Sequence, residues 1–194
     1  VLSGEGADEL FGGYLYFHYA PNCLEFDKEC KKLLKNIHYF DVLRSDRSIS
    51  SVGLEARTPF LDKNFVRTYL SIPAKFRCHK TNGREEKYLL RDAFKGVLPD
   101  EVLYRTKEAF SDGVSSSKKS WFETIQDHLS IAVFQKMSFS RNEPKTNEQK
   151  YYRTLFRKYF GERDDIIPYF WMPNFVEGAT DASARTLGIY KKSP

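Results

Sequence analysis

The sequence predicts a mainly α-helical body attached to the edge of a β-sheet. Hydrophobic residues recur at the 3.6-residue spacing of amphipathic helices through most of the 194 residues. Only Val1-Leu2, followed at once by Ser-Gly-Glu-Gly, has the character of a buried strand that ends in a loop. A strand needs neighbours, and no other strong strand pattern follows. We therefore expect the chain to be one piece of a larger α/β domain.

Amphipathic helices are expected in the order in which their hydrophobic stripes occur. Prolines separate several of these stripes, as at Pro59 and Pro144. Asn82-Gly83 predicts a turn before a helix that includes Glu85. The stripes predict helices at residues 24–40, 65–72, 88–94, 121–134 and 148–160, the last starting at Thr146 or Asn147, and an irregular tail from residue 163.

Composition and charge exclude several classes of protein. With 41% hydrophobic and 15% aromatic residues the chain can bury a core, which excludes a disordered linker. No stretch approaches the ~18 apolar residues of a membrane span, so no membrane partner is expected. The net charge of +5 comes from dispersed lysines and arginines without a basic stripe, so no nucleic-acid partner is expected either.

Three cysteines, Cys23, Cys30 and Cys78, form an odd set without Cys-x-x-Cys spacing. This pattern favours reduced thiols in a cytoplasmic protein over a disulfide framework. The four histidines show neither His-x-x-x-His nor His-Glu-x-x-His spacing. A structural transition-metal site is therefore not expected.

The first candidate site is the segment 3–9, Ser-Gly-Glu-Gly-Ala-Asp-Glu, which enters a helix expected to reach Tyr14. Two glycines between a strand and a helix expose backbone N–H groups, an arrangement suited to phosphate. The three carboxylates fit such a site if Mg²⁺ offsets the phosphate charge, or if one of them acts as a base. The alternative is a capped helix whose first-turn acids gain about 0.3–1 kcal/mol each from the helix dipole. Gly12-Gly13 inside this helix indicates close packing of another backbone.

Lys107 is the second candidate, in a loop of mixed charge that runs from Arg105 to Gly113. A lysine there can bind phosphate as a point charge or neutralise a departing pyrophosphate. The alternative is an exposed loop in which Lys107 pairs with Glu108 or Asp112, worth about 0–1 kcal/mol. Spacing alone favours this alternative.

The third candidate is Asp41 together with Arg44 and Ser45. If the helix from residue 31 continues, these side chains share one face because they are three and four residues apart. Such a face is either an internal salt-bridge network or a site for an amino acid. In the second case Asp41 would bind the ammonium group and Arg44 the carboxylate.

Three motifs together resemble the synthetase domain of glutamine-hydrolysing asparagine synthetases. They are residues 3–9, residues 54–62 (Leu-Glu-Ala-Arg-Thr-Pro-Phe-Leu-Asp) and residues 107–113 (Lys-Glu-Ala-Phe-Ser-Asp-Gly), in this order and at similar spacings. The similarity extends over nearly the whole chain, including residues 14–21 and 181–187. It implies an α/β fold of the adenine-nucleotide α-hydrolase-like, or PP-loop ATP pyrophosphatase, type. Residues 1–194 would be the C-terminal part of that domain.

The resemblance implies a carbon–nitrogen-bond-forming ligase of asparagine biosynthesis. Mg-ATP would adenylate the aspartate side chain to β-aspartyl-AMP with release of pyrophosphate. Ammonia, obtained from glutamine in the full enzyme, would then displace AMP to give asparagine. The implied cofactors are ATP and Mg²⁺. The implied partners are aspartate, ammonia or glutamine, and an N-terminal glutaminase domain of the same polypeptide, with a homodimer as one option for the assembly.

The resemblance also implies roles for individual residues. Residues that match Ser3 and Gly4 bind ATP, and the acid that matches Asp8 lies on the metal and pyrophosphate side. The glutamate that matches Glu5 acts at the reacting centre, where it helps to form the intermediate or deprotonates ammonia. The lysine that matches Lys107 stabilises the departing pyrophosphate. The residues that match the aspartate pocket are Asp41 and Arg44.

Two features of the family have no match in this sequence. One is the nucleophilic cysteine that begins the glutaminase domain. The other is a Ser-Gly-Gly-x-Asp-Ser pyrophosphate loop, which is expected upstream of Val1. We therefore expect the 194 residues on their own to be catalytically inactive.

Two rival functions remain open. A relative that adenylates a different carboxylate, such as a β-lactam synthetase or a peptide-modifying amidotransferase, shares the fold and differs in a few pocket residues. A non-catalytic helical interaction module is the rival from another class, and the presence of Glu5, Asp8 and Lys107 argues against it. A pyrophosphate loop in the reading frame upstream of Val1 would favour the enzyme.

Overall fold

The computed structural model describes residues 1–115, 119–129, 141–166, 168–179, 182 and 187–189. Their regular structure is helical, and the only β-type pairings among them are isolated bridges, Leu2 with Arg57 and Lys95 with Leu98. The prediction of a mainly helical chain is confirmed. Leu2 is 81% exposed, so the expected buried strand is not seen in the described residues. The α/β fold stays a prediction.

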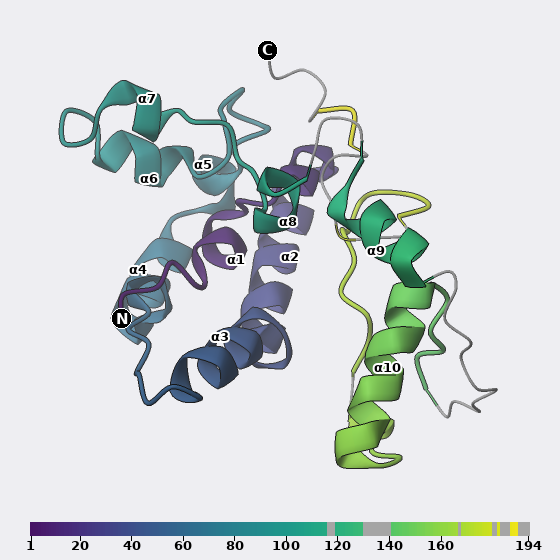
Figure 1. Cartoon of the computed structure of the whole chain (residues 1–194). Coiled ribbons are helices and arrows are strands. Elements are labelled where there is room, and N and C mark those ends of the chain that lie inside the picture. The colour runs from purple at the N-terminus through teal and green to yellow at the C-terminus, as the bar shows by residue number, and fades with distance from the viewer. Residues whose placement is uncertain (116–118, 130–140, 167, 180–181, 183–186, 190–194) are drawn as a thin grey trace. The chain divides into compact units, whose positions relative to one another are not determined.

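The chain divides into two compact units. The first comprises Val1–Lys107, Pro173–Ala179 and Thr186–Pro194, and the second comprises Glu108–Met172 and Thr180–Arg185. Figure 1 shows the helices of both units. Because all predicted site residues lie between Ser3 and Lys107, the first unit by itself positions the candidate site.

Seven α-helices are found in the described part of the first unit. The short helix α1 packs against the longer α2, and its residues Leu10 and Phe11 are buried. The ring of Phe11 meets that of Tyr69 from α4 at a centroid distance of 4.4 Å. These contacts fix α1, which begins within the first candidate segment, at Ala7. The helices are α1 (Ala7–Phe11), α2 (Cys23–Asn36), α3 (Asp41–Ser50), α4 (Lys63–Ser71), α5 (Ala74–Arg77), α6 (Tyr88–Ala93) and α7 (Asp100–Leu103).

The second unit contains α8 (Phe110–Gly113), α9 (Trp121–Leu129) and α10 (Asn147–Phe160), followed by a 3-10 turn, Asp164–Ile166. Helices α9 and α10 pack against each other. Asp164 is buried and binds Arg153 at 2.7 Å and Arg157 at 3.0 Å, so it ties the chain after α10 back to that helix. The irregular tail predicted from residue 163 is confirmed in the described residues apart from this turn.

Hydrophobic periodicity located most of the long helices. Helices α2, α4, α6 and α10 match predicted stripes, although α2 ends at Asn36 and a 3-10 turn, Ile37–Tyr39, follows it. Thr146 caps α10 as predicted, because its hydroxyl accepts a hydrogen bond from the N–H of Gln149 at 3.2 Å. The stripe at 121–134 is helical as far as Leu129, and its remaining residues lie outside the described part.

Two other predicted helix ends were also wrong. The first helix stops at Phe11, short of Tyr14, because Gly12 adopts a left-handed conformation with a φ of 63°. A Cβ atom on Gly12 would overlap the ring of Phe26 from α2, so this residue must be glycine. The helix expected to include Glu85 begins only at Tyr88, after Lys87, whose φ of 60° lies in the same left-handed region.

Candidate active site

A tight loop leads from Ser3 into α1. The Ser3 N–H donates to the carbonyl of Arg57 at 2.9 Å, and the Ser3 hydroxyl accepts from the N–H of Glu5 at 3.3 Å. Gly6 has a φ of 86°, and a Cβ atom there would overlap the side chain of Leu61. The run 54–62 therefore shapes this loop directly. Because α1 has five residues, little more than one turn, the phosphate site expected here would depend on loop N–H groups more than on a helix dipole.

Asp8 in α1 binds two lysines, one on each carboxylate oxygen. Lys87 Nζ lies 2.8 Å from Oδ1 and Lys107 Nζ lies 3.2 Å from Oδ2. Burial would raise the pKa of Asp8, but the charges of the two lysines outweigh it and lower the pKa below 3.8. The interpretation of Lys107 as the partner of Glu108 or Asp112 in an exposed loop was wrong. Lys107 is instead one of two cations held at the carboxylate of Asp8.

Sequence reasoning missed Lys87. Its partner Asp8 is 79 positions away, so no local pattern could show the pair. The available signal was Gly13, since a Cβ atom there would overlap both Cε of Lys87 and Oδ1 of Asp8. The glycine pair does mark close approaches, but of side chains, not of the expected second backbone. The left-handed backbone of Lys87, which costs about 1–3 kcal/mol for a residue other than glycine, is held in place around this ion pair.

Glu5, Arg44 and Asp41 form a second charged group. Nη2 of Arg44 lies 3.3 Å from Oε1 of Glu5 and 3.2 Å from Oδ1 of Asp41. Asp41 and Arg44 lie in a separate helix, α3, which begins at Asp41, so the condition that the helix from residue 31 continues is not met. Ser45, the third member of the predicted face, is buried. The predicted salt bridge between Asp41 and Arg44 is therefore confirmed. The side chains of Asp41 and Arg44 are also accessible to a ligand, at 39% and 67% exposed.

Two further residues, Glu9 and Tyr14, belong to the second charged group. The hydroxyl of Tyr14 lies 2.5 Å from Oε1 of Glu9 and 3.1 Å from Oδ2 of Asp41. Glu9 is only 5% exposed, and this burial raises its pKa to about 7. Burial also raises the pKa of Tyr14, which therefore stays a neutral phenol. These contacts could not be predicted from the sequence, because Glu9 and Asp41 are brought together by the packing of α1 and α3 on the rest of the unit.

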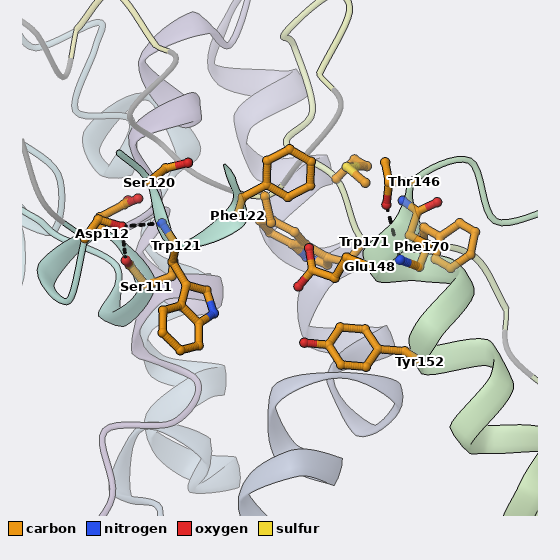
Figure 2. A pocket seen from close by; sticks show the side chains of 14 residues that line it. Ser111, Asp112, Ser120, Trp121, Phe122, Thr146, Glu148, Tyr152, Phe170 and Trp171 are labelled. Carbon is orange, nitrogen blue, oxygen red and sulfur yellow. Dashed lines mark hydrogen bonds between the residues drawn. The ribbon is translucent and has the colours of Figure 1, made fainter. Parts of the chain in front are cut away.

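A pocket of about 270 Å³ lies within the second unit (Figure 2). None of the predicted site residues lines it. Ser111 and Asp112 of the motif 107–113 do contribute to its wall. Aromatic rings dominate the rest of the lining, which includes Trp121, Phe122, Tyr152 and Trp171, with Glu148 beside them.

The sequence profile of the Asparagine synthase family matches residues 1–29 and 20–175 of this chain. The chain belongs to the Asparagine synthase family. Among curated relatives, glutamine-hydrolysing asparagine synthetases from Gallus gallus and Homo sapiens are 49% and 45% identical to it, each over 201 aligned residues. Both alignments cover 100% of this chain and 35% of the relative, so the chain spans about a third of their length.

The family profile includes every predicted site residue, from Ser3 to Lys107. Of these, the structure places Asp8 with Lys107, and Glu5 with Arg44 and Asp41. Ser3 and Gly4 lie in the loop immediately before α1. The described residues contain no cluster of three or more histidine, cysteine or acidic side chains that would hold a metal ion by itself. No helix in the described part of the chain is long and apolar enough to cross a membrane.

Proposed function

We propose that residues 1–194 are the C-terminal part of the synthetase domain of a glutamine-hydrolysing asparagine synthetase located in the cytoplasm. The reaction has two steps. A β-carboxylate oxygen of aspartate attacks the α-phosphorus of ATP, and pyrophosphate leaves. Ammonia then attacks the carbonyl carbon of β-aspartyl-AMP, AMP leaves with the electrons of the broken bond, and a base takes the proton. The main support is that two lysines paired with Asp8, and the ion pair of Asp41 with Arg44, lie in one unit.

The Asp8 group suits the pyrophosphate side of this reaction. A lone carboxylate fits Mg²⁺, which takes one or two protein carboxylates and completes its shell with water and substrate phosphates. Asp8 would hold that ion, which supplies neutralisation of the phosphate charge when bound. Lys87 and Lys107, released from Asp8, would bind the phosphate oxygens on which charge develops. Ser3 and Gly4, in the adjoining loop, would contact the nucleotide.

The Glu5 group suits the aspartate side. Asp41 would accept hydrogen bonds from the substrate ammonium group, and the guanidinium of Arg44 would bind the substrate carboxylate in a bidentate manner. Glu5 already contacts Arg44, so a substrate bound there would lie beside the Glu5 carboxylate. That carboxylate would take a proton from the attacking ammonia. Substrate charge replaces the internal ion pairs of Arg44 in this scheme.

The first measurement is aspartate-dependent release of pyrophosphate from Mg-ATP by the full-length gene product. Wild-type protein should release pyrophosphate only with aspartate. Glu5→Ala and Lys107→Ala should each lower kcat by at least a hundredfold, the scale of one general base or one transition-state cation. Lys28→Ala is the matched control, since Lys28 forms an exposed pair with Glu25 and should leave the rate unchanged.

The outcomes separate the proposed enzyme from its rivals. Release that requires another carboxylic acid would identify a different carboxylate-adenylating synthetase. Absence of release with any acid, while the protein is folded, would point to the non-catalytic module. The 194 residues alone are expected to form no asparagine, and ATP-dependent asparagine formation by them would contradict the proposal that the nucleotide site needs an upstream pyrophosphate loop.

A further inference from the structure

Tyr14 joins two carboxyl groups that belong to different helices. Its hydroxyl lies 2.5 Å from Oε1 of Glu9, in α1, and 3.1 Å from Oδ2 of Asp41, at the start of α3. The ring itself is held in place, because it stacks on the ring of Tyr16 with an interplanar angle of 8° and a centroid distance of 5.8 Å. A fixed ring on a buried neighbour places the hydroxyl at a defined point beside Asp41.

The two oxygens of Asp41 have different partners. Oδ2 faces the Tyr14 hydroxyl, and Oδ1 faces Nη2 of Arg44 at 3.2 Å. A carboxylate on its own rotates easily about its terminal torsion, because that torsion has broad minima. Contacts to both oxygens from two separate elements fix the plane of the group. Arg44 is largely exposed, so of the two partners Tyr14 is the better fixed one.

We propose that Tyr14 is a positioning residue of the amino-acid site. Its hydroxyl contacts both Oδ2 of Asp41 and the buried Glu9. These contacts hold Oδ1 of Asp41 in the orientation that binds the substrate ammonium group. This inference rests on the proposed function, because it assumes that Asp41 binds aspartate. In this scheme Tyr14 acts through Asp41 and not on the nucleotide or the reacting atoms. Its loss should therefore weaken aspartate binding and leave the chemical step of bound substrate nearly unchanged.

Tyr14→Phe removes the hydroxyl and keeps the ring. We expect the KM for aspartate to rise about tenfold, the scale of one hydrogen bond to a charged group. The KM for ATP and the kcat at saturating aspartate should stay within about twofold of wild type. Asp41→Asn removes the carboxylate that binds the substrate ammonium group. In that protein Tyr14→Phe should have little further effect on the KM for aspartate, because Tyr14 acts through Asp41.

Tyr16→Phe is the matched control. Tyr16 belongs to the same segment, is buried, and donates to Oε1 of Glu29 at 3.2 Å. Glu29 also binds Asn174 at 2.7 Å and Lys32 at 3.2 Å, and it contacts none of the predicted site residues in the described contacts. Tyr16→Phe should therefore lower the thermal midpoint as much as Tyr14→Phe does, while the KM for aspartate stays at the wild-type value.

The outcomes distinguish a failed inference from a failed function. Wild-type protein without aspartate-dependent pyrophosphate release would overturn the proposed function and this inference with it. If the wild-type protein is active, two results for Tyr14→Phe overturn the inference but not the proposed function. One is an unchanged KM for aspartate, and the other is an equal rise in the KM values for aspartate and ATP. If Tyr14→Phe does not fold, 3,5-difluorotyrosine at position 14 keeps the ring and strengthens the hydroxyl as a donor. An unchanged KM for aspartate in that protein would also overturn the inference.

Discussion

Glu9 is a carboxyl group whose burial makes the charged form costly. Its pKa of about 7 in the folded chain lies above the 4.5 of an ordinary glutamate, so the folded state binds its proton more tightly than the unfolded state. At pH values below 4.5 both states are protonated, and the group does not change stability. As the pH rises from 4.5 to 7 the folded state loses stability, and above 7 the loss is constant.

We expect Glu9→Gln to remove this loss. The rise of the pKa from 4.5 to about 7 corresponds to about 3 kcal/mol, so the variant should gain stability relative to wild type by up to that amount between pH 4.5 and pH 8. Urea unfolding at pH 5 and pH 8 measures the difference. Glu85→Gln, at an exposed glutamate, is the control and should follow wild type at both pH values. If the difference in unfolding free energy between wild type and Glu9→Gln does not change with pH, the raised pKa of Glu9 is contradicted.

Helix ends determine how the charged groups of the site meet. The stop of α1 at Phe11 and the start of α6 at Tyr88 bring Gly13 and Lys87 together at Asp8. Periodicity predicted where α2, α4, α6 and α10 lie, because a hydrophobic stripe is a local property of the sequence. It could not predict these two ends, since each depends on a left-handed residue whose conformation is fixed by contacts with distant segments.

The same limit applies to the site. The motifs named Glu5, Asp8, Asp41, Arg44 and Lys107, and the structure brings these residues together in two groups. Residues such as Lys87 and Tyr14 lie outside any chemical motif, and their roles follow from contacts that join positions dozens of residues apart. Sequence alone therefore predicted the charged groups of the site but not the residues that hold those groups in place.

Gly12→Ala and Gly13→Ala should have different effects although the two glycines are neighbours. Alanine at Gly13 would push Lys87 away from Asp8, so the rate of pyrophosphate release should fall at least tenfold with a modest loss of stability. Alanine at Gly12 would strain the helix end and displace Phe26 in the core, so the thermal midpoint should fall by several degrees. The surviving folded Gly12→Ala protein should keep its activity. Equal losses of rate in the two variants would show that the contact of Gly13 with Lys87 does not affect pyrophosphate release.

At the scale of the whole chain, the second unit has its own buried ionic centre. Arg153 and Asp164 are each 1% exposed at the side chain, and Arg157 shares the same carboxylate. Arg153 also donates to the carbonyl of Asn142 at 3.0 Å, so one guanidinium joins α10 to the chain on both sides of it. All of these contacts lie within the second unit, whereas every predicted site residue lies in the first.

Arg153→Met should therefore destabilise the second unit selectively. The substitution leaves Asp164 buried with one cation in place of two, and breaking a buried pair in this way costs about 3–5 kcal/mol. Hydrogen exchange should show the amides of α10 losing protection, while those of α1 and α2 keep theirs, because the described contacts of Arg153 lie within the second unit. Arg163→Met, at an exposed arginine next to Asp164, is the control and should change neither set. Equal loss of protection in α2 and α10 would mean that the two units unfold as one cooperative body, and stability of the candidate site would then depend on residues that contact none of its side chains.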